Sequence, residues 1–364
     1  MNKYIKPLAW LLALTLTAAL FAGCAKQEAP APAVEPAPAA QPEPVPEAEP
    51  EAAPAPVPEV NPDAEPESTP APEPEADPAE EDEENYDTGD ASLDDPLNQD
   101  DIGADELLVA SFGTSFNDNR RLTVGAIEKA MIAAFPDWSV RRGFTSQIII
   151  DHVKSRDGEV IDNMTEALDR AVANGVQRLV VQPTHLMDGL EYNDVVNEVA
   201  QYADAFTAVA VGKPILISDA DFSAVADAMA DCTKEYDDDK TAICWMGHGT
   251  EAASNSVYAK MQEVLTEKGY QNYFVGTVEA SPTLEDVLAL VKAGNYERVV
   301  LRPMMIVAGD HANNDMAGDE EDTWKTLFEA EGYEVVTDLT GLGELPAIQE
   351  LLIAHAKAAM EELK

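Results

Sequence analysis

The sequence predicts an α/β fold of two similar lobes, each a parallel sheet flanked by helices, with a ligand cleft between the lobes. Short apolar segments alternate with stretches in which apolar residues recur at helical spacing. Strands that alternate with helices indicate right-handed βαβ units, and continuous apolar strands indicate a parallel sheet covered on both faces. Segments of the second half of the globular part also repeat segments of the first half. Together these observations favour two four-stranded lobes.

Residues 1–24 are predicted to be a lipoprotein signal peptide that is not part of the fold. Two lysines precede the apolar run Leu8–Phe21, which is too short to span a bilayer. The run ends in Leu20-Phe-Ala-Gly-Cys24, which resembles a bacterial lipobox, although Phe21 stands where Leu is usual. We expect lipid on Cys24 to hold the protein, outside the cytoplasm, at the outer face of the cell membrane. An ordinary cleaved signal, with Cys24 incidental, is the alternative.

Residues 25–103 are predicted to form a disordered acidic tether. The segment is mostly Pro, Ala and Glu, and no Lys or Arg occurs between Lys26 and Arg120. Such a segment has too little apolar mass to form a core and repels itself, so a spacer is favoured over a binding role. The formal net charge of −46 also argues against nucleic acid or anionic lipid as partners. Contact with the membrane is therefore expected through the lipid anchor only.

The N-terminal lobe is predicted over residues 104–230 and the C-terminal lobe over residues 231–364. The predicted strands are 106–111, 139–144, 178–183, 208–211, 241–246, 273–278, 298–303 and 334–339. Helical spacing is found over 123–134, 165–174, 192–202, 254–269, 283–293, 324–332 and 347–363. The last of these is apolar on one face, so we expect it to close the fold by packing back on a lobe.

The two lobes are predicted to be copies of one strand–loop–helix series. Residues 178–193 overlay without a gap on residues 298–313, and residues 106–114 overlay on residues 242–250. A weaker overlay relates residues 140–146 to residues 275–281. The equivalent residues at predicted strand ends are Phe112 and His248, Phe144 and Glu279, and Glu191 and His311.

The C-terminal lobe is predicted to bind a divalent metal, because His248, Glu279 and His311 all follow strands of one sheet. Two imidazoles and a carboxylate suit a borderline metal such as cobalt, nickel, iron or zinc and leave coordination positions open. A phosphate loop at His248 is disfavoured because no Lys follows the glycines, and a buried structural histidine is the alternative. Side chains expected to orient the ligands are Asp310, Asn313 and Asp315.

Five motifs carry a family resemblance: Ser111-Phe-Gly-Thr-Ser115, Phe144-Thr-Ser-Gln-Ile-Ile-Ile150, Gly189-Leu-Glu-Tyr192, Met246-Gly-His-Gly249 and Ala308-Gly-Asp-His-Ala-Asn-Asn-Asp-Met316. They resemble the anaerobic cobalt chelatases of the CbiK type, which are sirohydrochlorin cobaltochelatases related to ferrochelatase. The resemblance covers residues 106–364 and implies a class II chelatase-like fold. It also implies a lyase that inserts Co²⁺ into sirohydrochlorin during cobalamin (vitamin B12) biosynthesis, with Fe²⁺ or Ni²⁺ as alternative metals.

By resemblance, the cobalt ligands are His248, Glu279 and His311, the proton acceptor is His248, and Glu191 is a carboxylate that faces the tetrapyrrole. The macrocycle is expected to lie against an apolar wall of Phe112, Phe144, Met187 and Met305. Sirohydrochlorin carries eight carboxylates, so basic side chains are expected near the rim. The candidates are Arg120, Arg121, Arg141 and Arg142, with Arg302 and Lys213 as weaker ones and simple surface solvation as the alternative.

The predicted location conflicts with the implied substrate, because sirohydrochlorin is a cytoplasmic intermediate. One alternative function is a membrane-tethered lipoprotein that binds haem or another tetrapyrrole for uptake, with His185 or His311 as an axial ligand. Another is metal delivery by the triad alone, although Glu191 favours a macrocycle in the cleft. Homo-oligomerisation remains open, and Cys232 and Cys244 are consistent with either a disulfide or two separate thiols.

Overall fold

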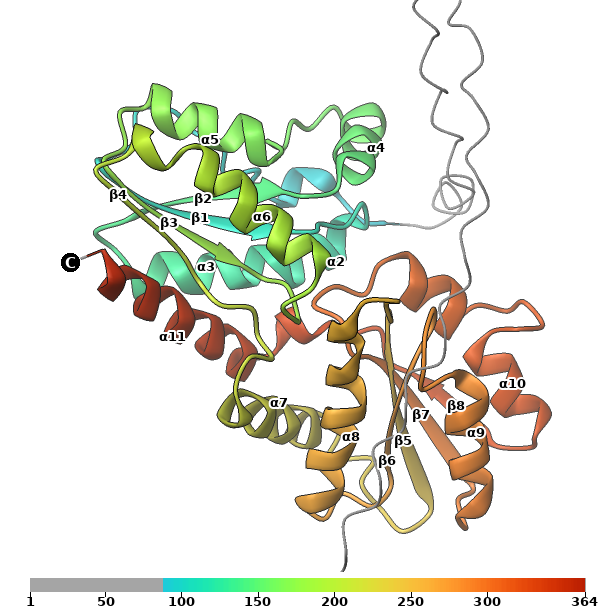
Figure 1. Ribbon diagram of the computed structural model, residues 1–364. Helices are drawn as coiled ribbons and strands as arrows, with labels where there is room; N and C mark the ends of the chain where they lie inside the picture. The colour runs from blue at the N-terminus through green and yellow to red at the C-terminus, as the bar shows by residue number, and fades with distance from the viewer. Residues whose placement is uncertain (1–87, 364) are drawn as a thin grey trace, which may run out of the picture. The chain divides into compact units, whose positions relative to one another are not determined.

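The computed structural model describes residues 88–363 (Figure 1). The predicted signal peptide, Cys24 and the tether as far as residue 87 lie outside the described residues. Within residues 88–363, no helix is both long and apolar enough to cross a membrane. Cys232 and Cys244 are free thiols, so they are not joined by a disulfide.

The N-terminal lobe contains a four-stranded parallel sheet in the order β2-β1-β3-β4. Its strands are β1 (Asp105–Ser111), β2 (Ser139–Phe144), β3 (Arg178–Pro183) and β4 (Ala208–Val211). The helices that precede β4 in the chain are α2 (Asn117–Leu122), α3 (Val124–Ala134), α4 (Gln147–Asp157), α5 (Met164–Ala173) and α6 (Leu190–Gln201). Five of the six residues of β2 and of β3 are buried, as expected for a sheet covered on both faces.

The C-terminal lobe contains a second four-stranded parallel sheet in the equivalent order β6-β5-β7-β8. Its strands are β5 (Thr241–Gly247), β6 (Tyr273–Thr277), β7 (Arg298–Pro303) and β8 (Glu334–Thr337). The helices after β4 are α7 (Asp219–Cys232), α8 (Ser256–Glu267), α9 (Leu284–Ala293), α10 (Trp324–Ala330) and α11 (Pro346–Glu362), with a π-helical turn η4 (Ala312–Met316) after β7. The predicted α/β fold of two similar lobes is therefore confirmed.

The internal repeat extends to individual hydrogen bonds. After β3, the Asn193 side-chain amide donates to the Gly189 carbonyl at 2.7 Å. After β7, the Asn313 amide donates to the Gly309 carbonyl, also at 2.7 Å. Beyond these hydrogen bonds the two loops differ, because the first continues into the regular helix α6 and the second into the wider turn η4.

The last helix of each lobe packs against the other lobe. Helix α7, which comes after β4, packs on α8, and α11, which comes after β8, packs on α3 and β3. Their buried faces join one apolar core that contains Ile127, Val225, Trp245 and Leu352. The expectation that the closing helix packs back on a lobe is confirmed, but the boundary predicted at residues 230/231 falls inside α7.

Residues 88–103 belong to the folded part, so the predicted end of the tether at residue 103 is wrong. Ala91–Leu93 form a short 3₁₀ helix, η1, and the Leu97 carbonyl accepts a hydrogen bond from the Arg142 amide of β2. The Asp94 carboxylate, almost fully buried, contacts the guanidinium groups of Arg120 at 2.8 Å and Arg142 at 2.6 Å. These buried ion pairs attach an otherwise acidic and polar segment to α2 and β2.

Candidate functional site

The three predicted metal ligands converge at one edge of the C-terminal sheet. His248 directly follows β5, Glu279 follows β6 by two residues, and His311 lies in the loop after β7. One donor atom from each lies within 4.8 Å of the other two. The two imidazole rings meet edge to face, with centroids 4.6 Å apart and planes at 85°. The strand order explains the convergence, because adjacent parallel strands end at the same edge of the sheet.

The loop around His248 depends on two glycines. Gly249 has a φ of +92°, in the left-handed region that residues with a side chain rarely adopt. A Cβ on Gly247 would lie 2.1 Å from a ring carbon of Tyr258, so no larger residue fits there. The Nδ1 atom of His248 lies 2.8 Å from the Gly249 carbonyl oxygen, and Nδ1–H donation to it leaves Nε2 with a free lone pair. The backbone thus orients this imidazole for binding a metal.

His311 is oriented by a side chain of its own turn. Its Nδ1 lies 2.7 Å from Asp315 Oδ2, and this hydrogen bond, more than any other effect, raises the pKa of His311. The Asn314 amide likewise donates to Asp310, and the Asn313 amide donates to the Gly309 carbonyl. All three residues that were predicted to orient the ligands therefore take part in hydrogen bonds within the His311 turn.

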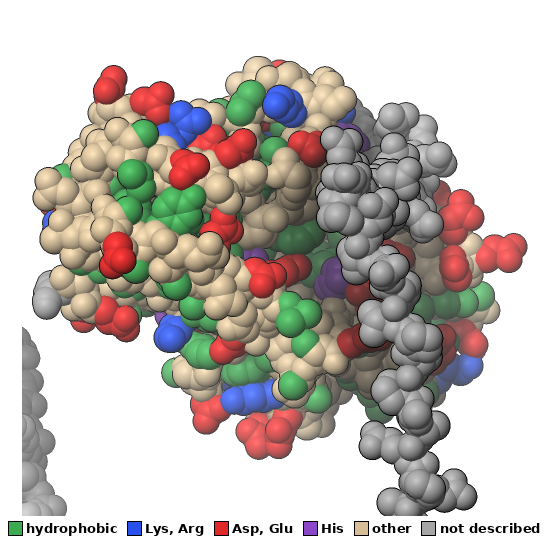
Figure 2. Space-filling view, turned by 45° about the horizontal axis from the view of Figure 1, so that its top comes forward, with side chains coloured by type: hydrophobic (Ala, Val, Ile, Leu, Met, Phe, Trp, Pro, Cys, Tyr) green, Lys and Arg blue, Asp and Glu red, His purple; other side chains and the backbone are tan. Residues whose placement is uncertain are grey.

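The donor atoms of the triad reach solvent. The side chains of His248 and Glu279 are about half exposed, at 48% and 53%, and that of His311 is 32% exposed. Figure 2 shows histidine side chains in a hollow of the surface, with acidic side chains close by. A metal held here would keep open positions for exchange, unlike one in a closed structural site.

Glu191 faces the triad from the N-terminal lobe, where it lies in the first turn of α6. Partial burial raises the pKa of the Glu191 carboxyl, and the proximity of His248 opposes this with a smaller effect. The Nε2 atom of His185 lies 3.7 Å from Glu191 Oε2. His185 is only 8% exposed, and burial lowers its pKa to about 4. A role for His185 as an exposed axial ligand is therefore contradicted.

The predicted apolar wall is partly wrong. Phe112 is 45% exposed at the end of β1, while Met187 and Met305 are partly buried. Phe144 is fully buried, because its ring packs under Gly113 and joins a cluster with Val124 and Val153. The ring is thus part of the core and does not line the cleft.

Two exposed apolar residues at this edge were missed. Ile148 at the start of α4 is 49% exposed, and Leu190 at the start of α6 is 70% exposed. Both residues lie within motifs that carried the family resemblance. Their position after the end of a strand was the signal that could have identified them as candidate site residues. Phe112 and Glu191 also line a pocket of about 290 Å³ together with Thr145, Gln147, Asn163, Met164, Thr165, Asp194, Val195 and Glu198.

Most of the arginines proposed for the rim are internal. Arg120, Arg141 and Arg142 are fully buried and Arg302 is 2% exposed. Arg142 pairs with Glu128 and Asp94, and Arg141 pairs with Asp162. Their charges are already compensated inside the fold, so they do not bind substrate carboxylates. Arg121 is partly exposed but pairs with Asp118, and Lys213 is exposed beyond β4.

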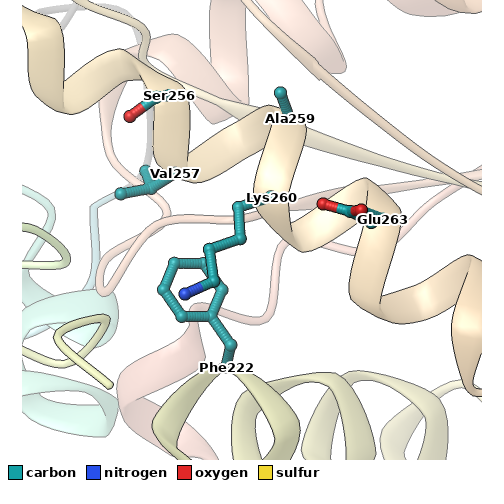
Figure 3. Close-up of a pocket in the computed structure, with 6 residues that line it drawn as sticks. All are labelled: Phe222, Ser256, Val257, Ala259, Lys260 and Glu263. Carbon is teal, nitrogen blue, oxygen red and sulfur yellow. The ribbon is translucent and has the colours of Figure 1, made fainter. Parts of the chain in front are cut away.

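A separate hollow of about 460 Å³ lies between α7 and α8 (Figure 3). The Lys260 amine lies 4.3 Å from the centre of the Phe222 ring and 2.5 Å from Asp219 Oδ1. None of the triad residues lines this hollow. Its single cation is already paired, so the candidate site is the edge that carries the triad and Glu191.

Comparison with known proteins identifies the family of this chain. Residues 105–361 match the family described as "Cobalt chelatase (CbiK)". A protein named sirohydrochlorin cobaltochelatase from Salmonella typhimurium is 35% identical over 254 residues, which is 70% of this chain and 96% of the relative. Sirohydrochlorin cobaltochelatase CbiKC from Nitratidesulfovibrio vulgaris is 29% identical over 259 residues, covering 71% of this chain and 91% of the relative.

Among solved structures, SirB from Bacillus subtilis with Fe³⁺ has a TM-score of 0.51 and 13% sequence identity, and the match covers 71% of this chain and 96% of SirB. At that identity the similarity bears on the fold alone. The family match over most of the globular part, together with the relative at 35% identity, shows that this chain belongs to the cobalt chelatase (CbiK) family.

Proposed function

We propose that this chain is a sirohydrochlorin cobaltochelatase, which inserts Co²⁺ into the tetrapyrrole. The observation that carries the proposal is the convergence of His248, Glu279 and His311 within 4.8 Å. The names of the two curated relatives supply the substrate and the metal. Glu191 supports a macrocycle as the second substrate, because it faces the triad from the other lobe and is outside the donor set.

Insertion of a divalent metal requires two pyrrole N–H bonds to lose their protons while the metal exchanges its ligands. In the proposed reaction Co²⁺ is first held by the triad, whose exposed donors let it move to the pyrrole nitrogens. His248 accepts one proton once it releases the metal. Glu191 accepts the other, and its raised pKa makes it a stronger base than an ordinary carboxylate. Co²⁺ binds the four nitrogens of the macrocycle as the two N–H protons pass to His248 and Glu191, so two positive charges leave the macrocycle as two enter it.

The test is an absorption assay with the full chain, sirohydrochlorin and Co²⁺, repeated with Fe²⁺ and Ni²⁺ to define the metal. The wild type is expected to accelerate insertion over the spontaneous reaction, and His248→Ala and His311→Ala are expected to lose that acceleration. His355→Ala is the matched control, because His355 pairs with Asp221 on α7 and is not near the triad. No acceleration by the wild type, with a shift of the haem Soret band on adding haemin, would instead support tetrapyrrole capture.

We further propose that lipid on Cys24 anchors the protein outside the cytoplasm, on the basis of the segment Leu20–Cys24. Cys24→Ser removes the thiol to which lipid would be attached. The variant is expected to leave the membrane fraction, whereas the wild type is retained there and incorporates labelled fatty acid. Equal membrane retention of the two chains, without label in the wild type, would contradict the anchor.

A further inference from the structure

The turn that carries His311 is held in part by the opposite lobe. Asn119, in α2 of the N-terminal lobe, accepts a hydrogen bond through its side-chain oxygen from the backbone amide of Ala308, at 2.8 Å. Ala308 is almost fully buried and precedes His311 by three residues. The bond therefore joins the N-terminal lobe to the backbone just ahead of a proposed metal ligand.

The rest of this turn is fixed by its own lobe. The carbonyls of Met305 and Ile306 accept hydrogen bonds from the amides of Leu342 and Gly343, at 2.8 and 2.9 Å. On the other side of Ala308, the Asn313 side chain donates to the Gly309 carbonyl. The Ala308 amide lies between these two supports and donates its hydrogen bond to the N-terminal lobe.

Close packing around this bond leaves little room for the lobes to slide. A Cβ on Gly309 would lie 3.1 Å from Thr114 Oγ1, and one on Gly343 would lie 3.0 Å from Thr123 Cβ. Thr114 and Thr123 both belong to the N-terminal lobe, on either side of α2. The glycines thus allow the two lobes to meet on both sides of the Asn119–Ala308 bond.

Asn119 is itself held in place within α2. Its carbonyl accepts from the Thr123 amide at 2.9 Å and from the Thr123 hydroxyl at 2.6 Å. The next residue, Arg120, is buried and pairs with Asp94 and Glu159. A side chain on so fixed a helix can define the position of a neighbouring turn, whereas one on a mobile loop cannot.

We propose that Asn119 is a positioning residue for the metal site, through which the N-terminal lobe sets the His311 turn of the C-terminal lobe. The inference rests on the proposed role of His311 as a metal ligand. Side chains that hydrogen-bond directly to metal ligands typically change metal affinity by about 10- to 100-fold when they are removed. Asn119 acts one step further away, through the Ala308 backbone, so the lower end of that range is expected. Any movement of the lobes that strains this bond would accordingly weaken the hold on Co²⁺.

The test compares Asn119→Ala with Asn119→Asp in the full chain, with Co²⁺ affinity measured by titration and no tetrapyrrole present. Asn119→Ala removes the acceptor and is expected to weaken Co²⁺ binding about tenfold. Asn119→Asp keeps an acceptor oxygen and is expected to stay within about threefold of the wild type. Asn272→Ala is the matched control, because it removes hydrogen bonds to Asp237 and Thr241 far from the triad.

Hydrogen exchange at the Ala308 amide gives a second readout that needs no metal. Faster exchange in Asn119→Ala, together with shifted His311 ring resonances, is expected. If the wild type binds no Co²⁺ but these changes occur, Asn119 still positions the His311 turn, whereas the proposed metal site and the chelatase function fail. The inference would be overturned if Asn119→Ala kept the Co²⁺ affinity and the His311 resonances of the wild type and lost only as much stability as Asn272→Ala. Asn119 would then have a structural role only.

Discussion

Glu191 is the proposed proton acceptor that is not among the proposed metal ligands, so a substitution there tests proton transfer separately from metal binding. It lies opposite His248, and partial burial raises the pKa of its carboxyl. Glu191→Gln keeps the shape of the side chain but cannot accept a proton. We expect the rate of Co²⁺ insertion to fall by about 10²-fold or more, because positioned proton acceptors typically contribute that much.

Two measurements on Glu191→Gln separate the roles of the residue. Single-turnover rates with sirohydrochlorin report proton transfer, while titration with Co²⁺ alone reports the triad. Metal affinity should match that of the wild type, since the donors of the triad are unchanged. A parallel loss of Co²⁺ affinity would place Glu191 among the metal ligands and contradict its assignment as a base.

The Glu106 carboxyl in β1 is buried 3.6 Å from Arg141, and burial raises its pKa to about 7. In the unfolded chain the carboxyl ionises near its ordinary value of 4.5. The folded protein therefore binds more protons than the unfolded chain between pH 4.5 and 7. The stability that the protonated Glu106 contributes is complete below that window and is lost as pH rises through it.

We therefore expect Glu106→Gln to be more stable than the wild type above pH 7, with the advantage disappearing as pH falls towards 4.5. Urea unfolding of both chains across this range measures the difference. Asp100→Asn provides the control, because Asp100 pairs with Arg170 at the surface. A stability difference that does not change with pH would show that Glu106 is ionised throughout.

At the scale of elements, α11 joins the two lobes through its buried face. Leu352 in α11 is fully buried in the apolar core that both lobes share. Leu352→Ala is expected to lower the free energy of unfolding by about 2–5 kcal/mol, as for other buried leucines that leave a cavity. Leu290→Ala, at a position on α9 that is 52% exposed, should change it by less than about 1 kcal/mol. Urea unfolding followed by circular dichroism compares the two, and equal losses would contradict the shared core.

The strands were predictable because buried parallel strands are continuous apolar runs, and the repeat because segments of the two halves overlay without a gap. The triad was predictable because its three residues follow strands of one sheet. Helices α2, α4 and α7 lie outside the helical ranges that were predicted. Helix α4 has three consecutive isoleucines in its first turn, which are typical of strands, and α7 is rich in Ala and Asp with little contrast between its faces. In both segments, packing against the rest of the fold determines that the chain is helical.

The environments of charged and aromatic side chains were the least predictable part of the site. Arg142 was expected at the rim but is buried, because Glu128 and Asp94 reach it from segments distant in sequence. Phe144 points into the core, where it packs with side chains of α3 and α4. The π-helical turn η4 was also missed.

At the scale of the whole molecule, the segment 88–103 is part of the N-terminal lobe through Asp94. Burial alone would raise the pKa of this carboxyl, but hydrogen bonds and charges from Arg142 and Arg120 hold it below its usual value. Asp94→Ala is expected to destabilise the fold by about 3–5 kcal/mol, because it leaves buried arginines short of a partner. Asp100→Ala, which removes a largely exposed pair, should cost less than about 1 kcal/mol. Chemical unfolding of the two variants checks the contrast, and similar small losses would place residues 88–103 outside the cooperative fold.

The place where this segment enters the fold also determines how the protein would bear mechanical load. Tension applied ahead of residue 88 would first meet the hydrogen bonds that the carbonyls of Thr88 and Gly89 accept from the Asp118 amide and the Asn117 side chain. It would then meet the Asp94 ion pairs, and after them the hydrogen bonds of Asn98 and Gln99 to the carbonyls of Val160 and Val140. Strand β1, which starts at Asp105, lies between β2 and β3 and would be pulled only after those contacts had broken. If the domain were held by its N-terminal end in moving fluid, the contacts of residues 88–103 would therefore break first. Strand β1, and the edge of the other lobe that carries the histidines, would bear no load until then.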